Sequence, residues 1–205
     1  MTITAIEPKR KGLSALYIDG EFALKVDTET IFAHRINVGD EIDDQTLKEL
    51  IDSSDIKRAK DKAMWLISYR DYTRKELIDK VSKDSSRDAA VKAVNRLEEL
   101  GLINDERFAR RYASDLLNIK HLPPIGAKRK LMEKGIEREL AEAVIDELDC
   151  DIDENITTVI DRKYAKNLSD EKGRRRCING LMRLGYSYSD IRSALNRYTD
   201  IEIND

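Results

Sequence analysis

Cysteine and long apolar runs are scarce in this sequence, and each scarcity excludes a class of protein. The 205 residues contain only two cysteines, Cys150 and Cys177. They lie far apart in different charge environments, so we expect reduced thiols rather than a disulfide framework. No apolar run approaches the roughly 18 residues that span a bilayer, and the segment Met1–Lys11 is strand-like and charged rather than signal-like. A soluble cytoplasmic protein without a membrane partner is therefore expected.

The residues that common active sites require are also missing. The only histidines are His34 and His121, and neither has a companion cysteine or histidine at metal-ligand spacing. His121 precedes Pro123-Pro124 and is predicted to be an exposed loop residue. The glycines are too scattered for a phosphate-binding loop, and the many carboxylates suit solvated helix faces better than catalysis. We expect no catalytic residue, no metal and no cofactor, and hence a protein that acts by binding.

Charge is abundant and is distributed in blocks. Charged residues make up 38% and hydrophobic residues 40% of the chain, a balance typical of amphipathic helices that each bury one stripe. Residues 139–154 contain eight acids and no base, whereas residues 162–197 contain ten bases against three acids, a balance of +7. Such alternation suits a polar partner, although solvated helix faces also carry charge runs.

The N-terminal part of the sequence predicts a small β-containing module over residues 1–50. Leu13–Ile18 and Phe22–Val26 flank Asp19-Gly20, a dipeptide that favours a two-residue hairpin turn. Ile3–Ile6 could add a third strand. Asp27-Thr28 could cap a short helix that ends near His34, and a second short helix is expected near residues 44–51.

From Ile56 onward the apolar residues recur with the period of a helix. The segment Leu131–Gly135 is repeated as Leu181–Gly185 at an offset of 50, which indicates tandem units. Gly135 and Gly185 are expected to end helices in the left-handed conformation. The pattern predicts three helical repeats, over residues 56–103, 104–150 and 153–199.

Two details of these repeats follow from the same pattern. Thr73 with Glu76, and Ser187 with Asp190, resemble capping boxes at helix starts. Pro123-Pro124 marks a break inside the second repeat.

Clusters of basic residues are the candidate binding site. They are expected to meet a polyanion or an acidic protein surface. Trp65 and most tyrosines are assigned to packing rather than to base stacking. The predicted partner-binding residues are Arg70, Arg74 and Lys75 in the first repeat, Lys128, Arg129 and Lys130 in the second, and Arg174, Arg175 and Arg176 in the third.

Two stretches of this sequence resemble a known family. Thr73–Leu77, followed by Leu97–Ala109 with its Leu-Gly-Leu-Ile-Asn-Asp string, is similar to the signature of RecX, the bacterial regulator of the RecA recombinase. The passage from Leu131 through Gly135 and Ile136 to Ala143 resembles that family's second repeat. The resemblance covers Ile56–Tyr198, and the N-terminal module resembles an extension that some members carry. The missing glycine near residues 84–86 departs from the repeat pattern.

The resemblance implies a mainly α fold of three tandem three-helix repeats in an elongated, curved array. It also implies a protein that lodges in the groove of the RecA filament on single-stranded DNA and mostly inhibits recombinase and coprotease activity. We also expect a monomer, and only weak binding to single-stranded DNA alone, because the acids of residues 139–154 should repel a free polyanion. An alternative is a stand-alone helix-turn-helix-like DNA-binding protein. The sequence pI of about 5.6 counts against it, because direct DNA readers are usually basic.

Overall fold

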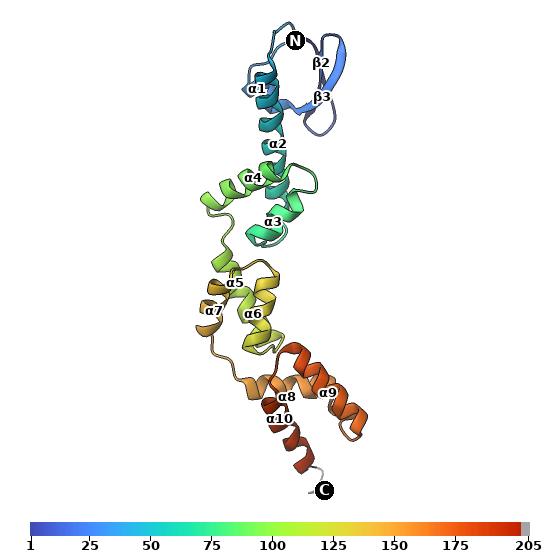
Figure 1. The fold of residues 1–205 in the computed structure, drawn as a ribbon, viewed down its shortest axis with the longest axis vertical. Helices are drawn as coiled ribbons and strands as arrows, with labels where there is room; N and C mark the ends of the chain where they lie inside the picture. The colour runs from blue at the N-terminus through green and yellow to red at the C-terminus, as the bar shows by residue number, and fades with distance from the viewer. Residues whose placement is uncertain (202–205) are drawn as a thin grey trace. The chain divides into compact units, whose positions relative to one another are not determined.

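The computed structural model describes residues 1–201, which divide into one unit up to Asn104 and a second from Asp105 onward. The first unit contains a three-stranded sheet and four helices, and the second consists of helices alone (Figure 1). The chain is therefore mainly α with a small N-terminal sheet, as the sequence predicts. Over this range no helix combines the length and the apolar character needed to cross a membrane.

The sheet is antiparallel, with the strands in chain order. Its strands are β1 (Ile3–Pro8), β2 (Leu13–Ile18) and β3 (Glu21–Asp27). The β2–β3 turn has φ of 51° at Asp19 and 92° at Gly20, which confirms the expected two-residue hairpin. Asp27 then caps helix α1 (Thr28–Ala33), because its carboxylate accepts a hydrogen bond of 3.1 Å from the Thr30 amide.

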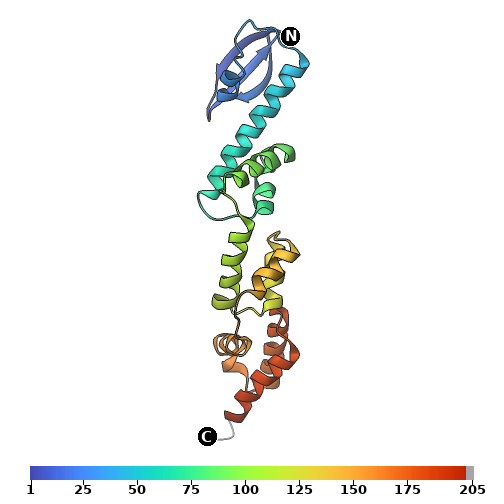
Figure 2. The same cartoon turned by 90° about the vertical axis from the view of Figure 1, so that its left-hand side faces the viewer.

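Helix α2 (Asp44–Ile67) is one continuous helix, so the prediction of a separate short helix at residues 44–51 is wrong. Its first half packs on the sheet, where Leu50 is fully buried with Ile3 and Leu16. Its second half contributes Ala59 and Ala63 to the next core. Figure 2 shows the sheet beside one half of this helix and the green helices beside the other. No glycine or proline interrupts the helix, so its backbone continues between the two cores.

Helices α3 (Arg74–Val81) and α4 (Arg87–Glu99) complete the first repeat around Leu77, Val94 and Leu97. The turn between them has no left-handed residue, in agreement with its missing glycine. The Ser85 hydroxyl instead donates to the Val81 carbonyl at 3.1 Å. Serine side chains thus provide at this turn the hydrogen bonds that a left-handed glycine arranges elsewhere.

The second unit contains two further three-helix cores. In each of them the first helix ends irregularly, in a π turn in one case and in a 3-10 turn in the other. The first core of the second unit contains α5 (Asp105–Ser114), η1 (Asp115–Ile119), α6 (Pro124–Glu133) and α7 (Arg138–Asp146). The second core contains α8 (Ile152–Lys163), η2 (Ala165–Asn167), α9 (Glu171–Leu184) and α10 (Tyr188–Ile201).

The two glycine turns are confirmed. Gly135 has φ of 89° and Gly185 has φ of 110°, which a side chain would resist. The amide of the following residue turns back onto the helix in both cases, from Ile136 to the Leu131 carbonyl at 3.1 Å and from Tyr186 to the Leu181 carbonyl at 3.2 Å. Helix α6 begins at Pro124, which also confirms the predicted break.

Candidate partner-binding site

Two of the three basic residues of the first repeat interact with neighbouring side chains. The Arg70 guanidinium lies 3.6 Å from the ring centroid of Tyr72, a cation–π contact. Arg74 links α3 to α4 through an ion pair of 3.2 Å with Glu98. Lys75 is exposed. This cluster therefore presents Lys75 more openly than its two arginines.

The lysines of the second repeat are paired with carboxylates. Lys128 on α6 contacts Glu142 on α7, and Lys130 lies 2.6 Å from Glu133 on its own helix. The hydrogen bond from Lys128, followed by one from Arg138, lowers the pKa of the Glu142 carboxyl, and Lys130 lowers the pKa of Glu133 in the same way. A partner would have to compete with these carboxylates.

Arg129 has a structural role between the second and third repeats. Its guanidinium donates a 2.8 Å hydrogen bond to the carbonyl of Arg183, near the end of α9. Close by, α6 meets α9 backbone to backbone, since a Cβ added at Gly126 would lie 2.1 Å from the Leu184 carbonyl oxygen. This residue, predicted to bind a partner, thus holds two repeats of the same unit together.

His121 belongs to the same contact between repeats, so the prediction of an exposed loop residue is wrong. It is only half-exposed, its Nδ1 lies 2.6 Å from the Asn155 side-chain oxygen, and the Tyr186 hydroxyl donates to its carbonyl at 2.6 Å. Its φ of 52° is held by these contacts. Asn155 also donates to the Cys150 sulfur at 3.3 Å. The sequence could not show this, because His121 and Asn155 are 34 residues apart.

Two of the three basic residues of the third repeat are accessible. Arg174 is half-buried, and its Nε donates to the Leu168 carbonyl at 2.7 Å. Arg175 forms an ion pair of 2.8 Å with Glu171, but the two side chains are 75% and 81% exposed, so the pair is weak. Arg176 is exposed and has no recorded side-chain partner within residues 1–201. Two guanidinium groups on α9 are thus open to a partner.

The clusters of the second and third repeats both lie near the starts of their helices, where Lys128–Lys130 are the fifth to seventh residues of α6 and Arg174–Arg176 the fourth to sixth of α9. Helix α6 has 10 residues and α9 has 14, a difference of about one helical turn. Because the extra turn precedes Gly185, the third-repeat arginines lie one turn farther from the glycine turn than Lys128–Lys130 do. The two clusters therefore do not repeat with the period of the glycine turns.

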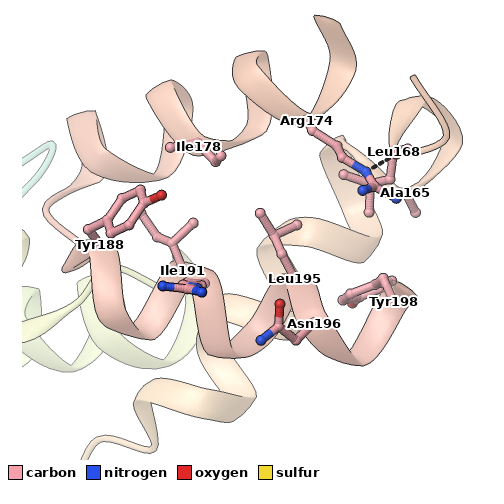
Figure 3. Close-up of a pocket in the computed structure, with 10 residues that line it drawn as sticks. Ala165, Leu168, Arg174, Ile178, Tyr188, Ile191, Leu195, Asn196 and Tyr198 are labelled. Carbon is pink, nitrogen blue, oxygen red and sulfur yellow. Dashed lines mark hydrogen bonds between the residues drawn. The ribbon is translucent and has the colours of Figure 1, made fainter. Parts of the chain in front are cut away.

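A pocket of about 220 Å³ adjoins Arg174 within the third repeat. Its lining combines apolar side chains from α9 and α10 with polar groups, as Figure 3 shows for Ile178, Leu195 and Asn196. Tyr188 and Arg192 also line it, and they are followed by Asn196 at spacings of four residues on α10. That spacing, which places side chains on one helix face, is the signal by which sequence reasoning could have found this row.

The acidic block, residues 139–154, is partly neutralised by ion pairs within the second unit. Of its eight acids, Glu142 pairs with Lys128, Glu147 contacts Arg110, and Asp153 lies 2.8 Å from Arg197. These contacts leave fewer uncompensated acids than the sequence count indicates. Among the residues with described structure, no group of three or more His, Cys, Asp or Glu side chains is arranged to hold a metal ion.

The assignment of Trp65 to packing is also wrong. Trp65 is 52% exposed and Tyr69 is 70% exposed, and their rings meet edge to face at 4.8 Å on α2. Lys62 lies 4.9 Å from the tryptophan ring. The helical period of α2 predicts which residues share a face, but it does not predict that the face carrying this pair is left exposed.

Repeated three-helix cores, each closed by helix pairs at tight turns, define a tandem helical-repeat protein. Two family models match this part of the chain, RecX second three-helix domain over residues 104–145 and RecX third three-helix domain over residues 151–195. The regulatory protein RecX of Caldanaerobacter subterraneus subsp. tengcongensis is 30% identical over 72% of this chain and 76% of its own length. The chain belongs to the RecX family.

Relatives and a solved structure extend the similarity to nearly the whole chain. The regulatory protein RecX of Clostridioides difficile (strain 630) is 24% identical over 98% of this chain and 97% of its own. A crystal structure of a regulatory protein RecX matches with a TM-score of 0.66 at 20% identity, covering 95% of this chain and 98% of that one. At 20% identity this crystal structure supports the fold alone. Because it covers 95% of this chain, the support includes both the N-terminal sheet and the helical repeats.

Proposed function

We propose that this protein regulates RecA by binding the RecA filament on single-stranded DNA, and that it mostly inhibits recombinase and coprotease activity. Membership of the RecX family supports the regulatory role, since the relatives are named regulatory proteins. The protein acts through contacts rather than through catalysis.

The observation that carries the proposal is the open pair of guanidinium groups on α9. Arg175 is largely exposed and Arg176 has no recorded partner in the described chain, so neither is needed to hold the repeat together. A guanidinium can bind a phosphate or a carboxylate through two parallel hydrogen bonds. A filament of protein on DNA offers both groups, and bare DNA offers only phosphates.

Weak binding to bare DNA is expected from exposed acids elsewhere in the second unit. Glu139, Asp146, Asp149 and Glu154 are exposed on the acidic block, and no ion pair is recorded for them within residues 1–201. They repel a free polyanion, yet they can pair with basic groups of a protein partner. The filament should therefore be preferred over single-stranded DNA alone.

The test is inhibition of RecA by Arg175→Ala/Arg176→Ala. The double variant should inhibit RecA ATP hydrolysis and strand exchange less than the wild type does. On single strands, loss of two phosphate contacts lowers the salt dependence of binding by a slope of about 1.4. The matched control is Arg162→Ala/Lys163→Ala, which removes the same charge from exposed positions on α8 of the same repeat.

Two outcomes would overturn the proposal. Wild-type inhibition by the folded double variant would remove the α9 cluster from the binding site. Tight wild-type binding to bare single-stranded or duplex DNA, with no effect on RecA, would favour the stand-alone DNA-binding protein instead.

A further inference from the structure

We propose that the pocket between α9 and α10 binds one unstacked base of single-stranded DNA together with a neighbouring phosphate. The inference rests on the proposed function, because it names the part of the nucleoprotein filament that this site recognises. It adds a base-binding site to what is otherwise an electrostatic contact with phosphates or carboxylates.

The size of the pocket limits its occupant to a single ring system. Its volume of about 220 Å³ lies below the range of about 300–1,000 Å³ typical of sites for drug-sized ligands. Leu168 and Ile191 are buried beside it, and Ile178 and Leu195 add half-buried apolar surface. A flat aromatic ring would displace water from these side chains.

The guanidinium of Arg174 is already oriented at this pocket, where it can bind an anion. Its Nε is held by the hydrogen bond of 2.7 Å to the Leu168 carbonyl, drawn as a dashed line in Figure 3. No other hydrogen bond or ion pair is recorded for its guanidinium in the described chain, so the two terminal nitrogens remain as donors. Because the group is already oriented, less conformational entropy is lost when an anion binds.

The row on α10 supplies the groups that recognise a base. Tyr188 is 59% exposed and lines the pocket, so its ring is open for stacking. Asn196 contributes an amide that both donates and accepts hydrogen bonds, as the edge of a base requires. Arg192, between them, adds a second cation.

The charge of the lining favours a nucleotide over an acidic peptide. Its charged residues are Arg174 and Arg192, with no carboxylate among the lining residues. An Asp or Glu side chain could use these arginines, but it would leave the tyrosine ring and the Asn196 amide without a role. A base with its phosphate uses all four groups.

The experiment compares two probes without RecA, at low salt where electrostatic binding is strongest. One probe is a fluorescein-labelled oligothymidylate, and the other is an abasic oligomer of equal length and charge. The wild type should prefer the base-containing probe by about tenfold, the usual scale of stacking on one aromatic side chain. Tyr188→Ala should remove that preference and leave binding of the abasic probe unchanged, while Tyr69→Ala on α2 should change neither.

Arg192→Gln is the second variant, and it should weaken both probes because it removes charge. The inference fails if the folded wild type binds both probes equally, or if Tyr188→Ala keeps the preference. It also fails if Tyr188→Ala weakens RecA inhibition without changing binding of either probe, which would assign the pocket to a protein side chain. RecA inhibition by the wild type, measured separately, shows whether the proposed function survives such a failure.

Discussion

Gly126 is a residue at which α6 comes into close contact with the end of α9. In an ordinary helix interior, replacing glycine by alanine stabilises the fold by up to about 1 kcal/mol. Here the added Cβ would lie 2.1 Å from the Leu184 carbonyl oxygen, which is backbone and cannot rotate away. We expect Gly126→Ala to destabilise the second unit by roughly 1–3 kcal/mol, the usual cost of overpacking.

Thermal denaturation followed by circular dichroism checks this prediction. Lys130→Ala, a change on the same helix at a side chain that is 43% exposed, is the control and should shift the melting temperature little. A higher melting temperature for Gly126→Ala would mean that the two backbones can separate without cost.

Cys177 is fully buried in the third core, and burial raises the pKa of its thiol to about 11. Only about one molecule in a thousand would carry the thiolate at pH 8, and a reagent could not reach it in the folded repeat. We expect Cys177 to react with a thiol reagent only as fast as the third repeat unfolds, measured in a Cys150→Ser variant. Fast labelling in native buffer would contradict the buried position.

Single residues show most clearly where the sequence was insufficient. The glycine conformations were predictable, because Gly135 and Gly185 each follow a helical stripe and precede an apolar residue. The environments of Trp65 and His121 were not predictable, because each depends on whether a distant part of the chain covers it. The four-residue spacing of Tyr188, Arg192 and Asn196 predicts from the sequence that they share one helix face. Only the structure shows that this face lines a pocket.

At the scale of elements, helix starts depend on side-chain caps. The Thr73 side chain is buried and accepts a 3.1 Å hydrogen bond from the Glu76 amide at the start of α3. Thr73→Ala should destabilise the first unit by about 1 kcal/mol, the typical value of an N-cap. Urea denaturation of the variant measures this loss, and Ser193→Ala, an exposed change within α10, should leave the midpoint nearly unchanged.

The elements themselves were predicted well where local chemistry decides them. Asp19-Gly20, Asp27, Pro124 and the Ser187 hydroxyl, which accepts from the Asp190 amide at 3.1 Å, all act where the sequence placed them. The error at α2 has a physical origin. Its apolar stripe packs on the sheet up to residue 50 and on the first repeat from residue 59. In the sequence, where only the apolar period can be seen, such a change of core resembles the end of a helix.

At the scale of the whole molecule, the separate cores predict separable folding. We expect a fragment that begins near residue 56 to remain folded, because its three cores share no buried residue with the cluster of the sheet. Limited proteolysis, with circular dichroism and a melting curve of the purified fragment, tests this. Insoluble or unfolded fragments at every start point after residue 50 would place the sheet within the fold of the repeats.

Helix α2 carries the last buried leucine of one core and the first buried alanine of the next, with Ser54 between them accepting a 2.8 Å hydrogen bond from the Asp27 amide. Amide protons in this middle stretch exchange with deuterium only when the helix opens there, so their protection reports the more stable of the two neighbouring cores. Protons near Leu47 should follow the sheet, and those near Ala63 should follow the first repeat. If the two cores differ in stability, exchange rates along this single helix should change in a step between this middle stretch and the less stable core, and binding of a partner to the first repeat would move only one side of that step.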